Sequence, residues 1–97
     1  MKQHTEQEIK DFMDAHYEAE KRYVYELKVD LVVDTPERIV FKAHCMYEAP
    51  PFNTALLFAL CEFFDTKHIN DVHRWSNGGC ETCAWGSDYG FELEVLP

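Results

Sequence analysis

The sequence predicts an α+β domain in which two helices pack on one face of a three- or four-stranded antiparallel sheet. Two segments carry apolar residues at helical spacing, one near the start of the chain and one near its middle. Further segments alternate apolar and polar residues with a period of two, which is typical of strands that have one buried face. Turn-forming residues separate these segments, so neighbouring strands are expected to pair antiparallel.

The first helix is expected over residues 5–21. Thr5 and Glu8 have the spacing of a capping box, in which each side chain accepts a hydrogen bond from the other residue's backbone N–H. Apolar and aromatic residues then recur every three or four positions and predict one buried face: Ile9, Phe12, Met13, His16 and Tyr17.

An antiparallel hairpin is expected from Tyr23 to Tyr47. Alternation over residues 23–34 predicts a first strand, and Asp34-Thr35-Pro36-Glu37 supplies the turn. The second strand is expected over residues 38–47. The inward positions of the two strands are Tyr23, Tyr25, Leu27, Val29, Leu31 and Val33, followed by Ile39, Phe41, Ala43, Cys45 and Tyr47.

The C-terminal half is expected to add a second helix and one or two strands. Asn53 is a suitable cap for an apolar helix that reaches about Thr66. Residues 69–76 form a short candidate strand. The last strand is expected over residues 89–96, with Phe91, Leu93 and Val95 buried. Residues 1–97 are interpreted as a single acidic domain, because a chain of 97 residues has no room for a second core.

The charge balance is strongly negative. Eighteen Asp and Glu residues stand against nine Lys and Arg residues, a formal net charge of −9. Phosphate contacts require cations, so we expect no direct binding to nucleic acid or anionic membranes and a partner that is basic. No apolar segment reaches the roughly 18 residues that span a bilayer, so we expect a cytoplasmic protein. The simpler interpretation is that the charge maintains solubility.

Cys80 and Cys83 flank a Cys-x-x-Cys turn within a Gly-containing loop, which is half of a zinc-knuckle pattern. A structural zinc needs two more ligands, and only His44, Cys45 or His73 are candidates for them. The more conservative interpretation is a loop with two reduced thiols and no cofactor. A redox dithiol is disfavoured because Glu81 lies between the cysteines and poor helix-forming residues follow them.

No catalytic motif appears in the sequence, so we expect a binding protein rather than an enzyme. The scattered histidines and the serines beside the Gly-containing loop match no nucleophile elbow, and no phosphate-binding glycine loop is present. The apolar segment 55–64 is either a dimer face or a helix buried within the chain, and we favour burial. A monomer or weak dimer is expected.

Carboxylates form rows on the expected surface elements. On the first helix they step along one side at intervals of three and four residues, about 4.5–6 Å per step. On the strands they occupy outward positions, spaced by about 7–13 Å. The predicted partner-binding residues are Glu8, Asp11, Asp14 and Glu18 on the helix, and Glu26, Asp30, Glu92 and Glu94 on the strands.

In its size, charge and rows of carboxylates, the chain resembles the small acidic phage-encoded inhibitors that mimic DNA, of which anti-CRISPR and anti-restriction proteins are examples. No sequence motif carries the resemblance. It implies an inhibitor in the host-cell cytoplasm that occupies the basic DNA channel of a defence complex, such as a type I CRISPR surveillance complex, and blocks target binding. The alternative is a small adaptor, with or without zinc, that mediates protein–protein interactions in a cytosolic complex.

Overall fold

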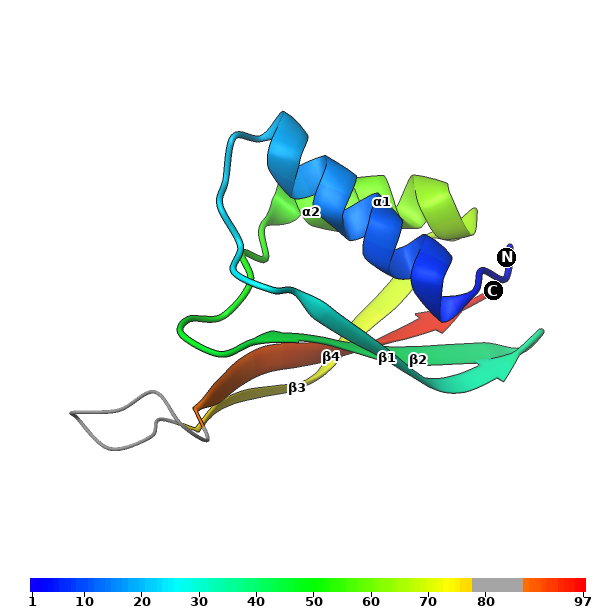
Figure 1. Ribbon diagram of the computed structural model, residues 1–97. Helices are drawn as coiled ribbons and strands as arrows, with labels where there is room; N and C mark the ends of the chain where they lie inside the picture. The colour runs from blue at the N-terminus through cyan, green and yellow to red at the C-terminus, as the bar shows by residue number, and fades with distance from the viewer. Residues whose placement is uncertain (78–86) are drawn as a thin grey trace.

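Two helices and four strands make up the fold, and the computed structural model describes residues 1–77 and 87–97. The elements follow one another as α1 (Glu6–Ala19), β1 (Lys28–Thr35), β2 (Arg38–Cys45), α2 (Thr54–Phe64), β3 (His68–Asn77) and β4 (Asp88–Leu96). The strands form one antiparallel sheet in the order β1-β2-β4-β3. Both helices lie on the same side of this sheet, which confirms the predicted α+β architecture (Figure 1).

The core lies between the helices and the two central strands. Alternate residues of β2 and β4 point toward the helices, and Phe41, Leu93 and Val95 have no solvent exposure. The helices contribute Met13 of α1 and Leu60 of α2, both also fully buried. Each element therefore hides one apolar face against the other layer, which is the packing that its sequence periodicity predicts.

The capping box at the start of α1 is confirmed. The hydroxyl of Thr5 accepts from the backbone N–H of Glu8 at 3.1 Å, and the Glu8 carboxylate accepts from the backbone N–H of Thr5 at 2.9 Å. Ile9, Met13 and Tyr17 form the buried stripe of the helix. The Tyr17 hydroxyl donates to the carbonyl of Pro51 at 2.6 Å and so ties α1 to the segment between β2 and α2.

The first strand begins five residues later than predicted, at Lys28 rather than Tyr23. Lys21 and Glu26 adopt positive φ values of 57° and 47°, which turn the chain on either side of the tyrosine-containing segment. Tyr23 is consequently 79% exposed and Tyr25 38% exposed, although both were predicted to face the core. Alternation alone cannot distinguish a half-buried strand from a loop that presents aromatic side chains.

A β-bulge shifts the register of β1. Leu31 pairs with Phe41, but Val33 pairs with Val40, so one residue between them has no partner in β2. The predicted inward position of Val33 is therefore wrong, because it lies beside Val40 on the face away from the helices.

The other boundaries lie close to the prediction. Asn53 caps α2 by accepting from the N–H of Leu56 at 2.9 Å, and β3 forms as a full edge strand. Tyr47 lies beyond the end of β2 and is 55% exposed, not buried as predicted. The apolar helix α2 buries Leu56, Leu60 and Phe64 in the core, while Phe58 points to solvent. Within the described residues, neither helix combines the length and apolar character needed to cross a bilayer.

The two faces of α2 provide a test of this packing. Leu60 is fully buried and Phe58 is 66% exposed on the same helix. Leu60→Ala is expected to lower the free energy of unfolding by about 2–5 kcal/mol, because it leaves a cavity in the core. Phe58→Ala is expected to change it by less than about 0.5 kcal/mol. Urea denaturation of both variants measures the difference, and equal losses would show that α2 packs through another face.

Candidate functional site

The outward side of α1 carries an acidic row. Asp11 and Glu18 are exposed on the side opposite the buried stripe of the helix, and Asp14 is half-buried beside that stripe. The helix holds five carboxylates and one lysine within Glu6–Ala19. Lys10 pairs with Asp14 at 2.5 Å, while Asp11 accepts only from the neutral amide of Gln7 at 2.8 Å. Within the described part of the chain, the Glu18 carboxylate has no partner.

Glu8 belongs to this row by position but has a structural role. One carboxylate oxygen accepts from the backbone N–H of Thr5, and the other lies 3.8 Å from Nδ1 of His4. The hydrogen bond from the Thr5 backbone is the first cause of a pKa of Glu8 below its usual value, and the nearby His4 lowers it further. The free part of the row therefore consists of Asp11, Glu18 and, shared with Lys10, Asp14.

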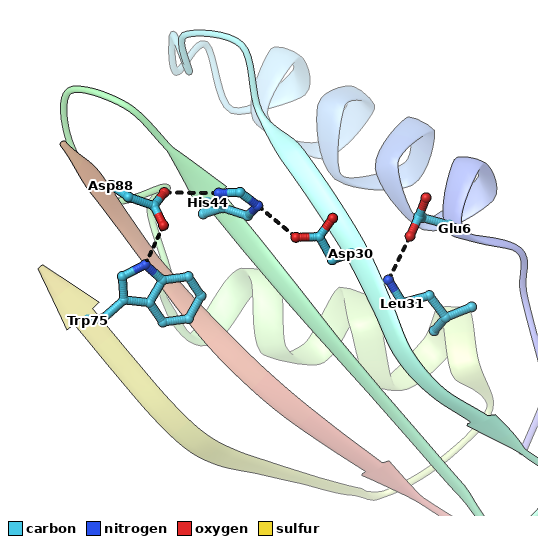
Figure 2. Close-up of polar contacts among 6 residues, drawn as sticks. All are labelled: Glu6, Asp30, Leu31, His44, Trp75 and Asp88. Carbon is cyan, nitrogen blue, oxygen red and sulfur yellow. Dashed lines mark hydrogen bonds and ion pairs between the residues drawn. The ribbon is translucent and has the colours of Figure 1, made fainter. Parts of the chain in front are cut away.

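The sheet face away from the helices carries a chain of polar contacts that crosses all four strands (Figure 2). Nε2 of His44 on β2 lies 2.9 Å from a carboxylate oxygen of Asp30 on β1. Its Nδ1 lies 2.9 Å from Asp88 on β4, and the indole of Trp75 on β3 donates to the other oxygen of Asp88 at 2.8 Å. We call these four residues the histidine relay. Only a protonated imidazole donates to both carboxylates.

The relay borders a shallow polar hollow of about 310 Å³. Trp75 forms its aromatic wall, with His73 stacked on the indole at 5.7 Å and the Lys42 ammonium 5.9 Å from the ring centre. The indole lies directly over Gly90, where a Cβ atom would come within 2.7 Å of the ring. Glycine at this point of β4 therefore permits the close approach of the indole.

Glu94, predicted as part of an exposed strand row, has basic and polar neighbours. Its carboxylate accepts from Arg38 at 2.5 Å and from Asn70 at 3.1 Å, and the side chain is 21% exposed. These two hydrogen bonds lower the pKa of Glu94. Glu92 is half-buried and lies opposite Lys42 on one side and His73 on the other.

The predicted row of Glu26 and Asp30 on the first strand does not form, and Asp34 does not extend it. Glu26 lies outside β1 at a positive φ, and Asp34 lies beyond the bulge, where its carboxylate accepts from Gln3 at 2.9 Å. Only Asp30 remains on the open face, where it contacts His44. Carboxylates on that face alternate with Lys28, Arg38 and Lys42, so the sheet offers mixed charge and α1 offers the continuous acidic row.

The proposed zinc ligands Cys80 and Cys83 lie outside the described residues. Among residues 1–77 and 87–97, no cluster of three or more His, Cys, Asp or Glu side chains has a geometry suited to a metal ion. The suggested additional ligands have other contacts. His44 lies between two carboxylates, His73 stacks on Trp75, and Cys45 is buried on the opposite face of β2 from His44.

A second hollow lies between the α1–β1 segment and the segment that follows β2. It has a volume of about 180 Å³ and contains three exposed tyrosines, so we call it the tyrosine hollow. It is lined by Tyr23, Val24, Tyr25, Cys45, Tyr47, Glu48, Ala49 and Pro51. Sequence analysis missed it because the tyrosines fit a buried strand pattern. Tyr47 lies 22 residues after Tyr25, so no local pattern in the sequence placed the three tyrosines together.

Comparisons of the chain with models of protein families, with curated proteins and with solved structures found no match.

The histidine relay predicts a measurable contribution of His44 to stability. His44→Ala removes an imidazole that is 18% exposed. The carboxylates of Asp30 and Asp88 then lose their contacts with its two ring nitrogens. The free energy of unfolding is expected to fall by about 1–2 kcal/mol, the range of charge-assisted hydrogen bonds at a partly solvated site. His68→Ala, at an exposed position on β3, is the control and should be near neutral. Circular dichroism during urea unfolding reports both, and an unchanged midpoint for His44→Ala would contradict the prediction.

Glu94 and Glu8 predict a loss of stability in acid. Both have a folded-state pKa below the ordinary 4.5, so their contribution is present above that value and is lost as pH falls through the lowered pKa. The urea concentration at the midpoint of unfolding is therefore expected to decrease as the pH is lowered from 4.5. Glu94→Gln should weaken this pH dependence while Glu37→Gln, at an exposed turn position, should not. Identical pH profiles for the two variants would show that the Arg38 contact is not linked to folding.

Proposed function

We propose that this protein is an inhibitor that binds the basic DNA channel of a defence complex and excludes the DNA target. The observation that supports this proposal is the acidic row on the outward side of α1, where carboxylates follow one another at intervals of three and four residues. Such a row presents successive negative charges along one line, as a phosphodiester backbone does. The target we propose is a type I CRISPR surveillance complex in the cytoplasm.

The mechanism is electrostatic competition. Lys and Arg side chains that would neutralise DNA phosphates pair instead with Asp11, Asp14 and Glu18. Opposite fields accelerate encounter, and exposed charge pairs weaken as salt is added, because they are screened over about 8–10 Å at physiological ionic strength. The structure favours α1 over the sheet as the contact surface, since the strand carboxylates Asp30 and Glu94 already have partners within the chain.

The alternative function, an interaction adaptor, is favoured by the tyrosine hollow. Large exposed aromatic side chains gathered around a cavity are typical of protein-binding surfaces, and Tyr23 and Tyr47 are 79% and 55% exposed. Capture of binding partners from the native host distinguishes the two functions. An inhibitor retains a DNA-binding complex, whereas an adaptor retains an assembly without a DNA channel.

A DNA-competition assay with a purified type I surveillance complex tests the inhibitor. The protein is expected to reduce DNA binding, and Asp11→Lys with Glu18→Lys is expected to weaken this effect by about tenfold or more, because two attractive contacts become repulsive. Glu8 is left unchanged because it caps the helix. Glu37→Lys with Glu62→Lys changes net charge equally at exposed positions away from α1 and should inhibit nearly as well as the parent.

Two results would overturn this proposal. One is full DNA binding in the presence of saturating protein. The other is equal loss of inhibition in the α1 pair and in the control pair, since overall charge rather than the acidic row would then be responsible.

A further inference from the structure

The tyrosine hollow has the form of a preformed pocket. Its floor is Cys45, which is 4% exposed, and its walls come from the α1–β1 segment and from the residues after β2. Tyr25 and Tyr47 meet edge to face with ring centres 5.0 Å apart. Among the described residues, none of the hydroxyls of Tyr23, Tyr25 and Tyr47 has a hydrogen-bond partner.

One backbone conformation beside the tyrosines is unusual. Glu26, directly after Tyr25, adopts the left-handed region that non-glycine residues rarely enter. Such conformations persist where the surrounding structure requires them and concentrate at binding sites. The positive φ of Lys21 belongs to the end of α1, where the N–H of Arg22 donates to the carbonyl of Tyr17 at 2.9 Å. Val24, between the two tyrosines, packs against the core, and Leu27 re-enters the core directly after Glu26, so Tyr23 and Tyr25 are left on the outer side of this segment.

The hollow is lined by a carboxylate, while the nearby cation Arg22 directly precedes Tyr23 and does not line it. Glu48 is the only ionic side chain that lines it in the described structure, and Glu26 lies at its edge as the first cause of a raised pKa at Tyr25. Burial, followed by the charges of Asp88, Glu48 and Asp14, raises the pKa of Cys45 to about 11. The thiol is therefore neutral at physiological pH, and the floor is an apolar surface beneath an acidic rim.

We propose that the tyrosine hollow binds the arginine side chain of a protein partner. A guanidinium group is planar, stacks on aromatic faces and pairs with a carboxylate through two parallel hydrogen bonds. The tyrosine rings and Glu48 supply both kinds of contact, and the free hydroxyls add hydrogen-bond acceptors. The residues that line this hollow lie outside α1, and the inference does not rest on the inhibitor function.

The probe is a blocked Gly-Arg-Gly peptide, titrated into the full-length protein and followed by NMR. Millimolar binding is expected, with shifts at Tyr23, Tyr25, Tyr47 and Glu48, because one exposed side chain supplies only a small interaction. The neutral citrulline analogue is expected to bind about tenfold more weakly, and the lysine peptide about threefold more weakly. Equal affinity of the arginine and citrulline peptides would overturn the proposal, and so would shifts confined to α1.

Matched variants distinguish binding of the peptide at the hollow from a general effect of the protein's charge. Tyr47→Leu and Glu48→Gln are each expected to weaken the arginine peptide about fivefold, whereas Tyr47→Phe keeps the ring and should retain most of the affinity. The controls Phe58→Leu and Glu37→Gln change exposed residues elsewhere and should have no effect. The α1 pair Asp11→Lys and Glu18→Lys should still bind the peptide, so the two proposals can fail independently. Equal losses in the Tyr47→Leu and Phe58→Leu variants would overturn the assignment.

Discussion

Burial of the helix-facing side of β2 and β4 is the constraint on which the rest of the structure depends. These central strands supply Phe41, Leu93 and Val95, and both helices cover them. β4 enters between β2 and β3 although it is last in the sequence. The N-terminal hairpin therefore acquires its complete partner surface only when the C-terminal strand pairs, which makes most of the stabilising contacts non-local.

In residues 1–77 and 87–97, no second layer of helices or strands covers the opposite face of the sheet. The histidine relay connects the four strands in their spatial order, from Asp30 through His44 and Asp88 to Trp75. The bulge in β1 places Val33 beside Val40, and Val40 is only 1% exposed although it faces away from the helices. The edge of β1 is also protected, because the Glu6 carboxylate accepts from the backbone N–H of Leu31 at 2.8 Å. The polar contacts of the relay and the apolar Val33–Val40 pair thus stabilise this face.

Local signals made much of the fold predictable. The capping box, the Asn53 cap and the alternation in the last strand depend on residues within a few positions of one another, and all three are confirmed. The bulge in β1 depends on how its register meets that of β2, so no pattern within the strand indicates it. The same limit applies to the site. His44 and Asp88 are 44 residues apart, and sequence analysis considered His44 only as a metal ligand.

The positions of the charges carry more information than the net charge of −9. Solubility requires only that charges be exposed, and it is satisfied when they are dispersed. On α1, Asp11, Asp14 and Glu18 instead stand at successive intervals of three and four residues, where like charges repel and destabilise a helix by a few tenths of a kcal/mol per pair. Lys10 pairs with Asp14 alone among these three carboxylates. The strand carboxylates Asp30 and Glu94, in contrast, contact His44 and Arg38. The proposed recognition of a basic surface would use this row, whereas solubility does not require charges to lie at these intervals.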